Sequence, residues 1–313
     1  MAEVEGLSGG RRSAVLGHPI AHSLSPALHL AAYRALGLDG WQYGRQDVQE
    51  SELAEVIASL DHHWAGLSLT MPLKHAVIPM LDHVEPLAGV VGAVNTVLVQ
   101  GRPARPGEAA PVGRPVLVGA NTDVHGIVAA LQEAVDAAGR PLPARPRAVV
   151  LGAGATAASA FAALGQLGCT TPTVHLRSLG RSGALIRAAH RMGVEPTYLP
   201  LDDAAESMID ADIVISTLPA HGADPIAADL AARAATSPGA LLDVVYEPRP
   251  TALSVVWAHG GGVVAGGERM LLHQAAEQVR LMTGRQAPLA AMDAALEAAL
   301  AGHETHPDKR SDR

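Results

Sequence analysis

The second half of the chain alternates short apolar segments with alanine-rich segments of helical length, and this alternation constrains the fold more than any other feature. The apolar segments cover Ala148–Leu151, Thr173–Leu176, 212–216 and 240–246. Strands separated by helices are joined by right-handed crossovers, which build a parallel sheet covered on both faces. The sequence therefore predicts an α/β domain with a parallel sheet in this half.

The first of these strands runs directly into a glycine turn. Residues 148–157 read AVVLGAGATA, so Gly152 and Gly154 follow the strand and precede a helix. Such a turn lets the backbone approach a pyrophosphate, whose charge is met by free N–H groups and by the helix dipole. The third position of the usual pattern is not glycine. The strand before, the helix after and the distance to the next strand still favour a dinucleotide site over a tight turn without a ligand.

The end of the next strand predicts which dinucleotide is bound. An NAD site has a carboxylate there for the adenosine ribose, whereas residues 175–181 read HLRSLGR. The two arginines and the serine of this segment suit a 2′-phosphate, and none of them is a carboxylate that could accept hydrogen bonds from a free ribose. We therefore predict NADP. The alternative interpretation is a pair of arginines on a solvated turn.

The first half of the chain mixes shorter strands and helices. We expect Ser25 to cap a helix that has Pro26 at its first position and stops at Gly37. Pro72 should begin another helix, with Lys74 in its first turn. A loop at 101–114, rich in proline, glycine and alanine, should be mobile and peripheral. Further strands are expected at 13–17, 41–48, 65–70, 93–99 and 115–119, and further helices at 51–60, 124–138, 270–282 and 289–301.

Two rare residue types mark candidate functional positions. Of the 23 basic residues only Lys74 and Lys309 are lysines, and Lys309 lies in a charged C-terminal segment. Because lysine can lose its proton where arginine cannot, Lys74 is a candidate for proton transfer, against the alternative of a solvated surface lysine. Asn95 and Asn121 are the only asparagines, and each precedes a threonine. They are candidates for specific hydrogen bonds, with ordinary turn residues as the alternative.

The composition excludes several classes of protein. A chain of 313 residues with 48% hydrophobic residues suggests two folded domains. The net charge of −8 provides no basic surface for nucleic acid or an anionic membrane. The single cysteine, Cys169, excludes an internal disulfide framework and a cysteine-rich zinc site. Residues 1–12 show no signal-peptide pattern, and the uncharged stretch 148–176 is better interpreted as strand, turn and helix than as a membrane span, so we expect a cytoplasmic protein.

Six segments, in order from about Gly17 to Gly284, resemble the shikimate dehydrogenase family. They read GHPIAHSLSP (17–26), GLSLTMPLK (66–74), AVNT (93–96), GANTD (119–123), DVVYEP (243–248) and MLLHQ (270–274). The resemblance implies an N-terminal α/β substrate-binding domain and a C-terminal NADP-binding Rossmann domain. It also implies reversible, NADPH-dependent reduction of 3-dehydroshikimate to shikimate, in the chorismate route to aromatic amino acids. The corresponding boundaries are 12–122 with 268–302 for the substrate domain and 123–267 for the cofactor domain, with 1–11 and 303–313 expected to be disordered tails.

The resemblance also assigns a role to individual residues. It implies that Lys74 and Asp123 are the catalytic pair, and a lysine beside an aspartate could polarise a carbonyl and deliver its proton. It implies substrate binding by Ser23, Ser25, Thr70, Lys74, Asn95, Asp123, Tyr246 and Gln274, the two serines holding the carboxylate. It implies cofactor binding by Gly152, Ala153, Gly154, Ala155, Thr156, Arg177, Ser178, Arg181, Val244, Gly267 and Met270. No metal is expected.

The sequence departs from the family pattern at three places. Ser68 stands where the family usually has asparagine, and Leu176 stands where asparagine commonly precedes the arginine. Serine still forms hydrogen bonds and Arg177 is retained, so both changes are compatible with the assigned roles. Glu268 and Arg269 replace small or apolar residues before Met270, where the nicotinamide is expected.

Other functions are compatible with parts of the sequence. Relatives within the family use quinate or an amino-substituted shikimate, and the two serines do not exclude these substrates. A catalytically silent NADP-binding regulator would be expected to lack Lys74 or Asp123, and both are present. The 15 histidines suggest a metal-dependent hydrolase, but no acid lies at ligand spacing near them. A serine hydrolase would need a Gly-x-Ser-x-Gly elbow, and the sequence has none. The sequence is compatible with a monomer or a homodimer.

Overall fold

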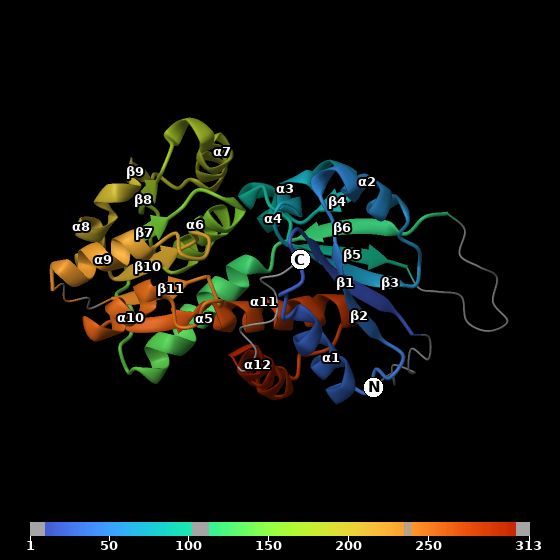
Figure 1. Cartoon of the computed structure of the whole chain (residues 1–313). Coiled ribbons are helices and arrows are strands. Elements are labelled where there is room, and N and C mark those ends of the chain that lie inside the picture. Colours follow the sequence, from blue (N-terminus) through green and yellow to red (C-terminus); the bar gives the residue numbers. More distant parts are fainter. Residues whose placement is uncertain (1–9, 102–112, 235, 237–238, 305–313) are drawn as a thin grey trace, which may run out of the picture. The chain divides into compact units, whose positions relative to one another are not determined.

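The computed structural model describes residues 10–101, 113–234, 236 and 239–304, and it divides the chain into two compact units (Figure 1). The first unit comprises Met1–Glu85, Val94–Ala120 and Ala275–Arg313, and the second comprises Pro86–Ala93 and Asn121–Gln274. Most of the loop expected at 101–114 and most of the two expected tails lie outside the described residues. Each unit contains one six-stranded sheet.

The sheet of the first unit is mixed, with the strand order β2-β1-β3-β5-β6-β4. The strand β1 is parallel to β2 and β3, whereas β5 is antiparallel to both of its neighbours. The strands are β1 (Arg12–Gly17), β2 (Gln42–Asp47), β3 (Trp64–Leu69), β4 (His83–Val84), β5 (Thr96–Gln100) and β6 (Val116–Ala120). The helices are α1 (Ser25–Ala35), α2 (Glu50–Ala58), α3 (Leu73–Ala76), α12 (Leu289–Glu304) and the short 3₁₀ helix Ile78–Met80.

The beginning of α1 differs from the expectation. Ser25 is the first helical residue and Leu24 takes the cap position, without a side-chain cap among the described residues. The prediction that Ser25 caps the helix is therefore wrong, because the turn that precedes the helix already has helical dihedral angles at Leu24. The Ser25 hydroxyl is consequently available for contacts other than capping.

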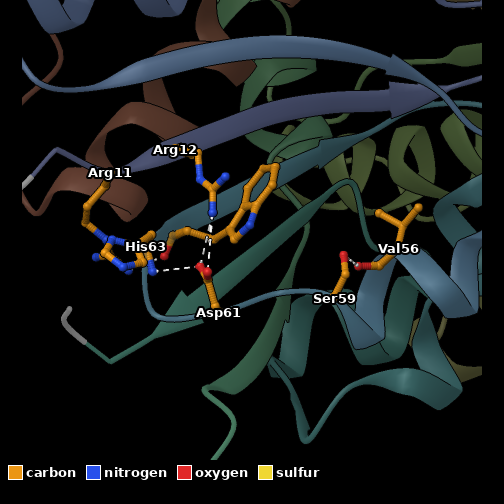
Figure 2. Close-up of polar contacts among 7 residues, drawn as sticks. Arg11, Arg12, Val56, Ser59, Asp61 and His63 are labelled. Carbon is orange, nitrogen blue, oxygen red and sulfur yellow. Dashed lines mark hydrogen bonds and ion pairs between the residues drawn. The ribbon is translucent and has the colours of Figure 1, made fainter. Parts of the chain in front are cut away.

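A small polar cluster joins the beginning of β1 to the loop before β3 (Figure 2). The guanidinium of Arg12 lies 3.3 Å from an Asp61 carboxylate oxygen and stacks over the Trp64 ring at 5.1 Å. The backbone N–H of His63 donates to the same carboxylate at 2.9 Å. Arg11, expected to belong to a disordered tail, instead donates hydrogen bonds to the carbonyl oxygens of Trp64 and Val99. The folded part of the first unit therefore begins earlier than the sequence indicated.

The sheet of the second unit is entirely parallel, with the strand order β12-β11-β10-β7-β8-β9. Its strands are β7 (Ala148–Leu151), β8 (Thr173–Leu176), β9 (Thr197–Pro200), β10 (Ile213–Ser216), β11 (Ala240–Asp243) and β12 (Val263–Gly266). Its helices are α4 (Pro86–Val91), α5 (Asp123–Ala137), α6 (Ala155–Gln166), α7 (Gly183–Met192), α8 (Ala204–Ile209), α9 (Asp224–Ala232) and α10 (Ala252–His259), with two 3₁₀ turns at Leu179–Arg181 and Leu201–Asp203. A further helix, α11 (Gly267–Thr283), begins in this unit and continues into the first.

Helices cover both faces of this parallel sheet. Val150 packs in one buried cluster with Phe161 of α6 and Ile127 of α5, whereas Val149 packs in another with Trp257 of α10. Successive residues of a strand point to opposite faces, so a strand buried on both sides must be apolar throughout. The predicted α/β class with a parallel sheet is confirmed. None of the described helices is both long and apolar enough to cross a membrane.

Candidate active site

The glycine turn after β7 provides exposed backbone groups at the beginning of a helix. Gly152 has φ +106°, which favours glycine, and a side chain there would collide with the Thr217 hydroxyl. Gly154 is the cap residue of α6, a helix of 12 residues whose first turn contains no acidic residue. A Cβ at Gly154 would meet no described atom within 4 Å. This arrangement fits a pyrophosphate, because the first N–H groups of a helix and the positive end of its dipole face the same side.

A cavity of about 390 Å³ lies at the carboxyl ends of β8 and β9. Arg177 and Ser178 line it, as the 2′-phosphate prediction requires, whereas Arg181 is not among its lining residues. The wall formed by β9 and the turn after it was not expected from the sequence. There Asp202 carries the only carboxylate among the described residues that line the cavity. A cation and an anion therefore share this candidate phosphate subsite.

The segment after β11 lies against the beginning of α11. A side chain at Gly267 would collide with the carbonyl of Val244, so the backbones of these two residues are in close contact. Glu268, one of the unexpected residues, is buried and lies 3.7 Å from the Arg249 guanidinium. Arg269, the other, donates two hydrogen bonds to Glu133 of α5, which hold the pKa of that carboxyl below its usual range. Both departures are thus accounted for by ion pairs within the second unit.

The substrate-binding candidates of the second unit lie where α5 and α11 pack together. Asp123 is the first residue of α5 and is buried, as is Gln274 of α11. The Thr122 hydroxyl lies 3.4 Å from the Gln274 amide oxygen. One turn along α5, a side chain at Gly126 would collide with Gln274 and with the Met270 carbonyl. The glycine therefore permits the close approach of the two helices, which brings Thr122, the residue before Asp123, to Gln274. The remaining candidate, Tyr246, is half-buried in the loop after β11.

Asn121 has a structural role in this unit. Its amide nitrogen donates to the Ala93 carbonyl at 3.0 Å and to the Ser159 hydroxyl at 3.1 Å. Its amide oxygen accepts from the Val124 N–H at 3.3 Å. Asn121 thus joins α5 to α6 and to the segment before Val94. These structural hydrogen bonds explain the presence of an asparagine here, and no ligand is needed to explain it.

The candidates of the first unit cluster around the carboxyl ends of β1 and β3. The N–H of Thr70 donates to Leu16 at the end of β1, and the N–H of Leu69 donates to the Asn95 carbonyl. The carbonyl of Lys74 accepts from the Val94 N–H at 2.9 Å, so the turn that carries the lysine is attached to the segment that carries Asn95. Ser23 and Ser25 lie in the connection from β1 to α1, where the Ser25 N–H lies 3.4 Å from the Ser23 hydroxyl.

Histidines do not form a metal centre in the described part of the chain. No group of three or more His, Cys, Asp or Glu side chains there is arranged to hold a metal ion. His18, one of the histidines that suggested a metal site, instead hydrogen-bonds Asp47 at 2.6 Å.

Sequence reasoning missed two buried residues near the first-unit candidates. Tyr43 of β2 and Gln278 of α11 hydrogen-bond to Ser68, which stands where an asparagine was expected. Gln278 lies one helical turn after Gln274, so its spacing was a usable signal. No comparable signal marked Tyr43.

Comparisons with known proteins cover nearly the whole chain. Residues 15–97 match the family described as the shikimate dehydrogenase substrate binding domain, and residues 267–297 match the shikimate 5′-dehydrogenase C-terminal domain. The chain is 35% identical over 305 residues to shikimate dehydrogenase (NADP(+)) of Moorella thermoacetica, covering 94% of this chain and 95% of that protein.

Two solved structures resemble the fold described above. The shikimate dehydrogenase of Mycobacterium tuberculosis is 38% identical, with a TM-score of 0.76 over 92% of this chain and 99% of the other. The quinate dehydrogenase of Corynebacterium glutamicum, solved in complex with NAD, is 26% identical, with a TM-score of 0.78 over 93% and 99% of the two chains. The extent and identity of these matches show that the chain belongs to the shikimate dehydrogenase family.

Proposed function

We propose that this protein is an NADP-dependent shikimate dehydrogenase, which interconverts 3-dehydroshikimate and shikimate in the chorismate route to aromatic amino acids. The observation that carries the proposal is the combination of full-length similarity to such an enzyme with Arg177 and Ser178 in the cavity beyond β8. We further propose a cytoplasmic location and a monomer or homodimer. The first unit corresponds to the substrate domain of the proposal and the second unit to the cofactor domain.

The cofactor supplies the hydride, and this chain's residues hold and orient it. The N–H groups of 153–156 suit the pyrophosphate, since Gly154 leaves the end of α6 uncovered by a side chain. The Gly152 N–H instead donates to the His175 carbonyl at 2.9 Å. Arg177 and Ser178 suit a 2′-phosphate, and Arg181 lies in the same turn. Val244, Gly267 and Met270 form the candidate nicotinamide contact. The backbones of Val244 and Gly267 are packed together without an intervening side chain, and Met270 lies in the first turn of α11, which begins at Gly267.

The substrate is held by groups that match its chemistry. Ser23 and Ser25 suit a carboxylate, because two hydroxyl donors lie in one turn at the beginning of α1. Thr70, Asn95, Tyr246 and Gln274 suit ring hydroxyls. Lys74 would donate a hydrogen bond to the substrate carbonyl oxygen and supply the proton that its reduction requires. Asp123, the other residue of the proposed catalytic pair, would accept a hydrogen bond from the substrate oxygen when it is a hydroxyl.

A quinate dehydrogenase is the second candidate, and the similarity to the C. glutamicum enzyme favours it. Quinate differs by one hydroxyl at the carbon that bears the carboxylate, so Ser23, Ser25 and Tyr246 would discriminate between the two acids. The deciding experiment follows nicotinamide absorbance with shikimate or quinate, each with NADP or NAD. Preference for shikimate with NADP supports the proposal. Equal or faster turnover of quinate with NAD would overturn the substrate and cofactor assignments together.

A further inference from the structure

A continuous chain of buried hydrogen bonds runs through the first unit. The Tyr43 hydroxyl donates to the Ser68 hydroxyl at 2.6 Å, and Ser68 donates to the Gln278 amide oxygen at 2.7 Å. All three residues are buried. Because they come from β2, β3 and α11, one set of polar contacts joins three separate elements.

Gln278 makes as many hydrogen bonds as a carboxamide ordinarily can. Its oxygen accepts from Ser68 and, at 3.3 Å, from the His29 imidazole, and its nitrogen donates to the Thr96 hydroxyl at 3.0 Å and the Asn95 carbonyl at 3.3 Å. Rotating the amide by half a turn would bring its N–H groups against the two donors. A buried polar group whose partners are all satisfied therefore has one orientation, and losing any partner is costly.

The chain of hydrogen bonds ends at Asn95, which Gln278 holds in two ways. Gln278 contacts the Asn95 carbonyl directly, and Thr96 relays the contact by donating to the Asn95 side-chain oxygen at 2.9 Å. Since the side-chain oxygen is directed at Thr96, the orientation of the whole Asn95 amide is set. An asparagine oriented in this way presents its N–H groups, rather than its oxygen, to any group beyond it.

We propose that Tyr43 and Gln278 are positioning residues, which hold Asn95 in a set orientation for a bound hydroxy acid. This inference rests on the proposed function, in which Asn95 binds a ring hydroxyl. A rigid substrate gains from preorganised partners, because misplacement of a binding group by about 1 Å costs much of its contribution. The chain also accounts for Ser68, whose short side chain leaves room for the carboxamide that Gln278 brings from α11.

The test compares two buried tyrosines of the same unit. Tyr43→Phe breaks the chain, whereas Tyr33→Phe removes a hydroxyl that donates to Ser13, outside the chain. Shikimate affinity is measured by calorimetry, KM by nicotinamide absorbance, and stability by the thermal midpoint. We expect Tyr43→Phe to raise the Kd and KM for shikimate about fivefold to twentyfold, with an unchanged KM for NADP. Both variants should lower the thermal midpoint by similar amounts, because each removes one buried hydroxyl. Tyr33→Phe should nevertheless leave the Kd and KM for shikimate unchanged.

A second variant, which removes another hydrogen bond of the same series, provides an independent test if one variant fails to fold. Ser68→Ala should reproduce the Tyr43→Phe pattern, and the double variant should bind shikimate no more weakly than either single variant, because residues that act as one unit are not additive. If Tyr43→Phe, Ser68→Ala and Tyr33→Phe all bind shikimate like the wild type, the inference fails while the proposed function stands. A wild-type protein that does not bind shikimate would overturn the proposed function and this inference with it.

Discussion

The imidazole of His29 stacks on the phenol ring of Tyr43, with ring centroids 3.9 Å apart and ring planes inclined by 16°. Burial lowers the pKa of His29 to about 3 and raises the pKa of Tyr43 above its ordinary value. Both rings are therefore neutral at neutral pH. The hydrogen-bond chain that includes them keeps one protonation state there, and only acid should disturb it.

Acid should destabilise the protein through His29. Between its ordinary pKa of 6.5 and its native value of about 3, the unfolded state binds a proton that the folded state does not. The contribution of neutral His29 to the free energy of unfolding is fully present above about pH 6.5. As the pH falls below this value, the free energy of unfolding decreases by about 1.4 kcal/mol per pH unit from this group alone. The measurement is the free energy of unfolding, from urea titrations at several pH values between about 6 and 4.

His29→Gln retains a donor for Gln278 but cannot titrate, so its stability should fall less steeply with acid by that amount. His63→Gln is the matched control, because His63 is an exposed histidine of the same unit (Figure 2) and should retain the wild-type slope. An unchanged slope in His29→Gln would show that His29 is not the group that titrates.

Lys74→Ala should lower kcat by about a hundredfold to ten-thousandfold and change the KM for shikimate much less, because the group acts on a proton in the transition state. Lys309→Ala, which removes the only other lysine and lies outside the described residues, should leave kcat unchanged. The assay is nicotinamide absorbance under saturating substrates. Near-normal turnover in Lys74→Ala would remove this residue from the mechanism.

Arg177→Ala should raise the KM for NADP about tenfold to a hundredfold and change the KM for NAD little, because only NADP carries the 2′-phosphate. Arg187→Ala on α7 is the control, since it removes an exposed arginine that does not line the cavity. An equal increase in the KM values for NADP and NAD would show that Arg177 does not bind the 2′-phosphate.

Asp202→Asn should lower the KM for NADP about twofold to fivefold, because it removes a negative charge from the cavity that Arg177 lines. Asp203→Asn changes the net charge identically from the adjacent exposed position, which does not line the cavity. The ratio of the KM values for NADP and NAD distinguishes a local effect from a general one. If both variants shift the ratio alike, Asp202 has no specific influence on the phosphate.

Gly126→Ala should lower the free energy of unfolding by about 1–3 kcal/mol, because its methyl group would collide with α11 at Gln274 and Met270. Gly165→Ala in α6 is the matched control, since a Cβ there meets no described atom within 4 Å. That variant should instead gain up to about 1 kcal/mol from the better helix propensity of alanine. Denaturant unfolding of both variants measures the difference, and a stabilised Gly126→Ala would contradict the packing.

The elements that the sequence predicted best are those whose pattern is local. The buried strands β7, β8 and β10 are short segments in which apolar residues predominate, and α6 follows a glycine turn, so local sequence patterns located them. The strands β4, β9 and β12 were missed, and all three lie at sheet edges. The strand β4 has only two residues, β9 is mostly exposed, and β12 is a four-residue strand containing glycine. Such strands are defined by the partner that pairs with them rather than by their own residues.

The sequence by itself determined the parallel sheet, the glycine turn and the types of residue available for chemistry, because strand hydrophobicity, turn geometry and side-chain functional groups are properties of short segments. Only the tertiary structure decided that Tyr43, Ser68 and Gln278 form one buried chain, and that Asp202 shares a cavity with Arg177. A hydrogen bond or a shared cavity depends on distances between side chains remote in sequence. Those distances are set by how the elements pack, which no local pattern records.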